Sequence, residues 1–145
     1  MKKFTIILFA GLITIMSFSC KSTKYTPTDF PDAQITFGSG GGFTGAVTDY
    51  TLLENGQLFK RNSMKNEFLA LHKVKKRVVS QMFKNYEFLN IGEETINDPG
   101  NLYYFIQFKD KDKKEHKITW NDQSTVSDNV KTYYANLTSI VKKEG

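Results

Sequence analysis

The chain contains few of the residues that most often cross-link or catalyse. Its 145 residues include one cysteine, two histidines, one tryptophan and three prolines. A single cysteine cannot close a disulfide within the chain, so the fold must rely on its hydrophobic core. With only His72 and His116 as histidines, no pair has the spacing of metal ligands, and no Gly-x-Ser-x-Gly segment supplies a nucleophile. We therefore expect a protein that is not an enzyme and that holds no metal and no cofactor.

Neither sign of charge is in large excess. Lysine and arginine number 20, and aspartate and glutamate number 15, which gives a formal net charge of +5 at pH 7. A mildly basic chain of mixed charge lacks the strongly positive surface that binds nucleic acid. We therefore expect no nucleic-acid partner.

The long apolar run of this sequence stands at its beginning. Phe4 to Met16 counts 13 residues, which is short of the roughly 20 residues that a membrane-spanning helix needs. Lys2 and Lys3 precede the run, and a basic start followed by a short apolar stretch is typical of a secretory signal peptide. We predict that residues 1–19 are this signal peptide.

Ser17-Phe18-Ser19-Cys20 follows the apolar run and resembles the lipobox of bacterial lipoproteins, although Ser17 and Phe18 depart from its usual pattern. The resemblance implies that Cys20 carries diacylglycerol and an acyl chain such as palmitate, which would anchor the protein to a membrane of the cell envelope. Lys21 in place of aspartate favours the outer membrane over the inner. The alternative is an ordinary signal peptide cleaved near Ser19, which leaves an exposed free thiol.

Removal of residues 1–19 leaves 126 residues, which is the size of one domain. Residues 20–32 are mostly polar and include Pro27 and Pro31, so we predict a flexible tether that starts at the lipidated Cys20. Residues 33–145 are predicted to form a single α+β domain.

Strand-like and helical patterns follow one another along this domain. Asn55-Gly56 between two strand-like runs predicts a hairpin with a two-residue type I′ turn. Apolar residues at helical spacing predict one helix from about Lys73 to Tyr86 and a second that starts near Ser124 or Ser127. Strands are predicted at residues 34–37, 46–53, 58–61, 102–108 and 116–120, with 68–71 as an optional further strand. The order predicts an α+β fold, an antiparallel sheet of four to five strands with two helices packed on one face.

The stretch from Gly38 to Gly45 contains five glycines in eight residues. Gly40-x-Gly42-x-x-Gly45 matches the Rossmann fingerprint, but a strand instead of a helix is predicted to follow it, and the other motifs of a protein kinase are missing. A crossover between strands and a binding loop both explain the run, because glycine allows positive φ and close approach of another group. The candidate partner-binding residues are Gly40, Gly41, Gly42, Phe43, Thr44 and Gly45.

Charged clusters elsewhere favour ordinary solvated surfaces. Asp110-x-Asp112 begins like a calcium loop, but Lys114 occupies the next ligand position. An acidic loop would hold a cation only if it folded back on itself; its residues are Glu93, Glu94 and Asp98. The first predicted helix has a basic face, for which a solvated surface is favoured over a binding patch: Lys73, Lys75, Lys76, Arg77 and Lys84.

The segment Gly41-Gly42-Phe43-Thr44-Gly45 follows a predicted strand and precedes a strand, a hairpin, a helix, two strands and a helix. It resembles the emfourin-type inhibitors of thermolysin-like metalloproteases, which open with a strand and a similar Gly-Gly-Phe-small-Gly segment. The element order matches over most of residues 34–141 and implies kinship of fold. The chain departs in its lipid anchor, its extra glycines and its longer middle, and no inhibitory residue is carried over.

Two functions follow as expectations. The first is a lipid-anchored cell-envelope protein with a small protein-binding domain, in its most specific form a protease-inhibitor-like module. The second is a structural or assembly lipoprotein of the envelope with no inhibitory role, which docks through its sheet or its basic helix.

Overall fold

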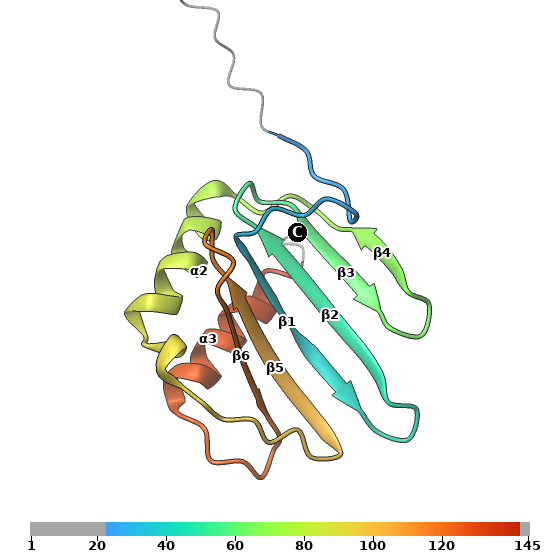
Figure 1. Cartoon of the computed structure of the whole chain (residues 1–145), viewed down its shortest axis with the longest axis vertical. Helices are drawn as coiled ribbons and strands as arrows, with labels where there is room; N and C mark the ends of the chain where they lie inside the picture. Colours follow the sequence, from blue (N-terminus) through green and yellow to red (C-terminus); the bar gives the residue numbers. More distant parts are fainter. Residues whose placement is uncertain (1–22, 143–145) are drawn as a thin grey trace, which may run out of the picture.

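A computed structural model describes residues 23–142 of the chain. It shows one antiparallel sheet with both α-helices on one side of it (Figure 1). The predicted signal peptide and Cys20 lie outside the described residues. The elements in chain order are β1 (Gln34–Gly41), β2 (Ala46–Leu53), β3 (Leu58–Asn62), β4 (Glu67–Ala70), α2 (Lys76–Phe88), the short 3-10 helix η2 (Ile91–Glu93), β5 (Leu102–Lys109), β6 (Glu115–Trp120) and α3 (Asp128–Ser139).

The sheet has six strands in the order β4-β3-β2-β1-β5-β6. The α+β class and the two helices are confirmed, whereas the prediction of four to five strands is wrong. The weakly predicted strand is β4, whose four residues are all exposed, so no alternation of buried and exposed positions marks it in the sequence. β1 pairs along its length with β2 on one side and with β5 on the other, which joins the two halves of the chain at the centre of the sheet.

The hydrophobic core lies between the sheet and the two helices. Ile35 and Phe37 of β1 are fully buried, and Ile106 and Ile118 lie beside them on β5 and β6. The hydroxyl of Tyr133 donates a 3.0 Å hydrogen bond to the carbonyl of Met82 and so joins α3 to α2. The buried helix residues are Val79, Met82, Tyr86, Val130, Tyr133 and Leu137.

Local hydrogen bonds determine where each helix begins. α2 begins at Lys76, later than the predicted Lys73, because the chain before it is extended and the Val74 amide donates to Gly56 O at 2.8 Å. α3 begins after Ser127, whose hydroxyl accepts a 3.3 Å hydrogen bond from the Val130 amide. This N-cap confirms one of the two predicted starting points.

The β2–β3 hairpin is confirmed, but its turn is not of type I′. A type I′ turn needs positive φ at both central residues; Gly56 has φ 89°, and Asn55 does not have positive φ. The Gly56 amide donates to Leu53 O and the Leu53 amide donates to Gln57 O, each at 2.9 Å. The connection between β2 and β3 therefore consists of residues 54–57, and Asn55 Oδ1 stabilises the turn by accepting from the Gln57 amide at 2.9 Å.

The described part of the predicted tether, residues 23–32, is attached to the domain. The Gln57 side chain accepts from the Tyr25 amide at 2.8 Å and donates to the Tyr25 carbonyl at 2.9 Å. The Phe30 ring packs against Phe59 at a centroid distance of 4.9 Å and against the edge of Phe68 at 5.7 Å. Phe59 alternates with the core residue Leu58 along β3, so this packing covers part of the sheet face opposite the helices.

Candidate functional site

The glycine-rich run forms the end of β1 and the turn of the β1–β2 hairpin. Strand pairing continues as far as Gly41 and Ala46, so the turn consists of Gly42, Phe43, Thr44 and Gly45. The Gly45 amide donates to Gly42 O at 3.1 Å, and the Gly42 amide donates to Asn101 O at 2.7 Å. All six candidate partner-binding residues therefore lie on one tight hairpin, which is tied to the segment before β5.

Backbone conformation and packing account for these glycines. Gly41, Gly42 and Gly45 have φ values of 101°, 73° and 61°, a region that other residues enter at a cost of about 1–2 kcal/mol. A Cβ atom on Gly40 would lie 2.7 Å from the Tyr103 hydroxyl oxygen and 2.9 Å from Val47 Cγ2. The hairpin is therefore held in a defined conformation and is not a slack loop.

The hairpin turn presents the ring of Phe43 to solvent. Its relative exposure is 108%, and none of the ring contacts between described residues includes it. Thr44 beside it is also exposed, and its hydroxyl accepts from the Ala46 amide at 3.4 Å. A large aromatic ring on an ordered turn is a candidate anchor for another molecule.

Two more exposed apolar side chains lie at the same end of the sheet. Leu102, which is 59% exposed, begins β5 and pairs with Gly41. Met64, which is 68% exposed, lies in the β3–β4 turn. In Figure 1, both turns and the start of β5 lie at the end of the sheet opposite the start of the described chain. Phe43, Met64 and Leu102 are together called the tip surface below.

Hydrogen bonds join the β3–β4 turn to the start of β2, next to the β1–β2 turn. The Ser63 amide donates to Val47 O at 2.9 Å, and the Val47 amide donates to the Ser63 hydroxyl at 2.8 Å. Neither Met64 nor Leu102 was predicted to be a site residue. Leu102 shares the alternation of the core-facing residues of β5, and Met64 stands in a polar turn, so only their exposure in the folded sheet identifies them.

The predicted acidic candidates do not form a cation site in the structure. Both the Asp112 amide and the Lys114 amide donate to Asp110 Oδ1, at 2.8 and 2.9 Å, so this oxygen closes the β5–β6 turn. Asp98 accepts a 2.8 Å hydrogen bond from the Ser124 hydroxyl. Within residues 23–142, no group of three or more histidine, cysteine, aspartate or glutamate side chains is placed to hold a metal ion.

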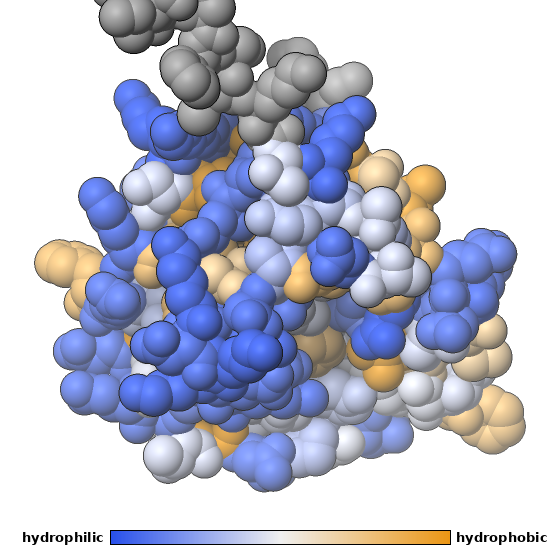
Figure 2. Space-filling view, turned by 45° about the horizontal axis from the view of Figure 1, so that its top comes forward, coloured by the Kyte–Doolittle hydropathy of each residue, from blue (hydrophilic) through white to orange (hydrophobic). Residues whose placement is uncertain are grey.

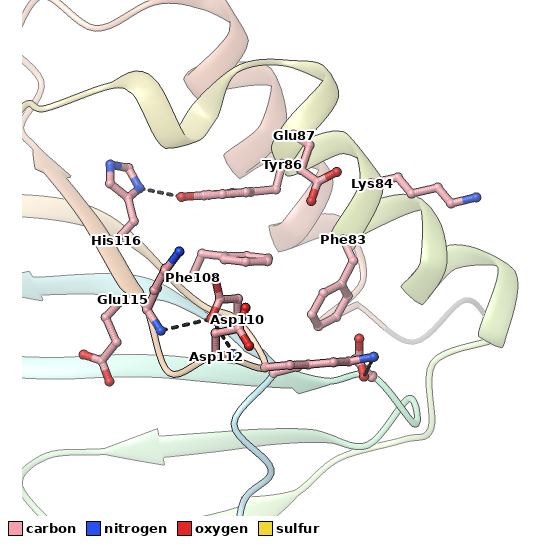
Figure 3. Close-up of a pocket in the computed structure, with 13 residues that line it drawn as sticks. Phe83, Lys84, Tyr86, Glu87, Phe108, Asp110, Asp112, Glu115 and His116 are labelled. Carbon is pink, nitrogen blue, oxygen red and sulfur yellow. Dashed lines mark hydrogen bonds and ion pairs between the residues drawn. The ribbon is translucent and has the colours of Figure 1, made fainter.

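A shallow cavity of about 500 Å³ lies between α2 and the β5–β6 hairpin (Figure 3). Its apolar wall is formed by Phe83, Tyr86 and Phe108, and the rings of Tyr86 and Phe108 stack at a centroid distance of 4.0 Å. Side chains of both charge signs surround this wall, among them Lys84 and Glu87. The mixed charge gives the cavity no clear preference for an anionic or a cationic ligand.

His116 and Tyr86 form a hydrogen-bonded pair on the wall of this cavity (Figure 3). His116 Nε2 lies 2.7 Å from Glu94 O, and because a carbonyl only accepts, Nε2 carries the proton. His116 Nδ1 then accepts from the Tyr86 hydroxyl at 2.6 Å. Burial raises the pKa of Tyr86 to about 12, so the phenol keeps its proton at neutral pH. Both imidazole nitrogens are occupied, and the pair serves to join α2 to β6.

No protein-family model matches the sequence, and no curated protein is significantly similar to it. Among residues 23–142, no helix is both long enough and apolar enough to cross a membrane.

Proposed function

We propose that the protein is a lipid-anchored protein of the cell envelope, without enzymatic activity, whose α+β domain binds a protein partner through the tip surface. The observation that carries this proposal is Phe43, fully exposed at the turn of a hairpin whose conformation is fixed by glycines. Aromatic side chains at the centre of an interface contribute much of its binding energy. An ordered hairpin also loses little conformational entropy when it binds.

The proposed anchor is Cys20, at the end of the signal-peptide pattern, and the proposed location is the outer membrane. The described chain begins at Thr23, at the end of the sheet opposite the tip surface (Figure 1). An anchor three residues before Thr23 would leave the tip surface pointing away from the lipid. This arrangement supports a role in which the tip surface meets a partner in the space beside the membrane.

A protease-inhibitor-like action is the more specific form of the proposal. A four-residue turn that ends in one aromatic ring has a suitable shape to enter the cleft of a partner protein. The segment Gly41–Gly45 resembles the corresponding segment of emfourin-type inhibitors. A thermolysin-like metalloprotease is accordingly the first partner to test.

The alternative is a structural or assembly lipoprotein with no inhibitory role. β4 favours it, because it is an edge strand of the sheet and its Leu69 side chain is 61% exposed. An exposed edge strand can add a strand from another protein through its unpaired backbone groups.

The proposal is tested by replacing Phe43 with a photo-crosslinking amino acid in the full chain, expressed in bacterial cells. We expect a protein partner to be crosslinked at this position and not at Phe88, an 81% exposed phenylalanine at the end of α2. Phe43→Ala should abolish co-purification of that partner, and Phe88→Ala should retain it.

Unchanged co-purification of Phe43→Ala would contradict the proposal. Loss of the partner on Leu69→Ser alone would favour the structural alternative. The inhibitory form predicts that wild-type protein slows peptide hydrolysis by a thermolysin-like protease and that Phe43→Ala does not.

A further inference from the structure

The basic start of α2 lies beside the point where the described chain begins. Asn55 Nδ2 donates to Thr23 O at 2.6 Å. Gly56, the next residue of the same turn, accepts from the Val74 amide at 2.8 Å. Val74 is followed directly by Lys75, Lys76 and Arg77. The first described residue and the basic segment are therefore held by neighbouring residues of one turn.

Positive charge is concentrated in this part of the chain. Five lysine or arginine residues and no acidic residue occur between Glu67 and Glu87. α2 has no acidic residue in its first turn and no side chain that caps its N-terminus, so the positive end of its dipole adds to the side-chain charge. Such a charge distribution destabilises the helix, so helix stability does not account for it.

Some of the neighbouring charges at this end of the molecule are paired. Lys111 Nζ lies 3.3 Å from a Glu54 carboxylate oxygen, and Lys109 Nζ lies 3.6 Å from Asp32 and 3.5 Å from Glu115. By contrast, no ion pair between described residues includes Lys76, Arg77 or Lys84. Figure 2, which brings this end forward, shows a broad hydrophilic surface.

The packed N-terminal segment keeps the proposed anchor close to these cations. Residues 23–32 are attached to the domain, so only the three steps from Cys20 to Thr23 can act as a tether. A fully extended chain spans at most about 3.6 Å per residue, which limits this tether to about 11 Å. Electrostatic interactions extend over a Debye length of about 8 Å at physiological ionic strength. A tether this short would keep the start of α2 near the membrane and allow it to approach the surface to within this length.

We propose that the basic start of α2 docks on anionic lipid headgroups of the membrane that carries the anchor. The docking residues are Lys73, Lys75, Lys76 and Arg77, and the inference rests on the proposed lipidation of Cys20. Each lysine or arginine near an anionic membrane surface contributes about 1 kcal/mol of binding. Anchor and basic surface act at the same end of the domain, so together they hold it in one orientation, with the tip surface away from the membrane.

The experiment uses the full chain, purified from membranes and reconstituted in two kinds of vesicle. One is phosphatidylcholine alone, and the other contains phosphatidylglycerol as well. Lysines are acetylated, and the rate at each site is measured by mass spectrometry. We expect Lys76 to react several-fold more slowly on the anionic vesicles. Lys65 in the β3–β4 turn and Lys131 on α3 are matched controls, which should react equally on both. Concentrated salt, which shortens the Debye length to about 3 Å, should abolish the difference.

A second variant separates docking from anchoring. Lys76→Gln with Arg77→Gln should restore fast acetylation of Lys73 and Lys75 on anionic vesicles while the chain stays bound through its acyl chains. If the rate at Lys76 were the same on both kinds of vesicle, as is expected for the control Lys65, the inference would be overturned. Failure of the wild-type chain to remain on phosphatidylcholine vesicles would instead refute lipidation, and slow acetylation of Lys76 on anionic vesicles would then still support the docking surface.

Discussion

Gly41 shows how a single residue determines the shape of the hairpin that carries Phe43. Its φ of 101° lies in the left-handed half of backbone space, and a Cβ atom there would overlap the carbonyl oxygen of Asn101. The same oxygen accepts the 2.7 Å hydrogen bond from the Gly42 amide. An added side chain at position 41 would therefore strain the backbone and also disturb the link between the hairpin and β5.

We predict that Gly41→Ala lowers the free energy of unfolding by about 2 kcal/mol or more, because both conformational strain and the clash oppose the native hairpin. Urea denaturation followed by circular dichroism measures this change. Thr44→Ala in the same turn is the control and should alter stability by less than about 0.5 kcal/mol. Equal stability of the two variants would mean that the hairpin tolerates a side chain at position 41.

At the scale of elements, the N-terminal segment acts as part of the domain although it has no regular secondary structure. Tyr25 is hydrogen-bonded to Gln57, the Phe30 ring packs on Phe59 and Phe68, and Asp32 lies 3.6 Å from Lys109. These contacts tie residues 23–32 to strands β3, β4 and β5 and to the β2–β3 turn. Removal of this segment would expose aromatic rings on the sheet face that the helices do not cover.

We predict that Phe30→Ala destabilises the domain by about 2 kcal/mol, roughly half the cost of deleting a fully buried phenylalanine, because its ring is only partly buried. Chemical denaturation of the full chain provides the measurement. Phe88→Ala is the matched control, since that ring is 81% exposed and its loss should cost less than about 0.5 kcal/mol. A segment that acts as a free tether would give the same small effect for both substitutions.

The sequence predicts the regular elements of this fold better than their contacts. The periodicity of β5 and α3 is strong enough to place them, and the sequence limits the start of α3 to Ser124 or Ser127, of which the structure shows Ser127 to be the N-cap. β4 lacks alternation because both of its faces are exposed. α2 begins later than predicted because the Val74 amide donates a hydrogen bond to Gly56 O, in a different part of the chain. Phe43 could be named as a candidate in advance, whereas Met64 and Leu102 join it only because the strand order brings separate turns to one end.

At the scale of the whole molecule, tyrosines that are buried or partly buried should make the stability of the fold decrease at alkaline pH. Burial raises the pKa of Tyr86 and of Tyr134 to about 12, and burial also raises the pKa of Tyr133, compared with an ordinary value of 10.0. The folded state therefore holds these protons more tightly than the unfolded state. Their contribution to stability is fully present below pH 10 and is lost as the pH rises toward 12 and above.

We predict that the melting temperature falls steadily between pH 10 and pH 12. Tyr134→Phe removes one of the responsible groups and should make the fall less steep, although it also removes the 3.1 Å hydrogen bond from the Tyr134 hydroxyl to Gly38 O and so lowers stability at pH 8. Melting curves recorded across this range test the prediction. An unchanged slope in Tyr134→Phe would show that this tyrosine does not contribute to the pH dependence.

The small number of residues between Cys20 and Thr23 would also set the height of the tip surface above the membrane. β1 has eight residues, and at about 3.3 Å per residue it extends roughly 26 Å. With the start of the domain held at the lipid surface, Phe43 would stand a few nanometres above the bilayer. It would stay at about this height while the protein diffuses along the membrane. A soluble partner would meet it by diffusion in three dimensions. A partner anchored in the same membrane would meet it by lateral diffusion, and only if its own binding cleft lay at the same distance from the lipid.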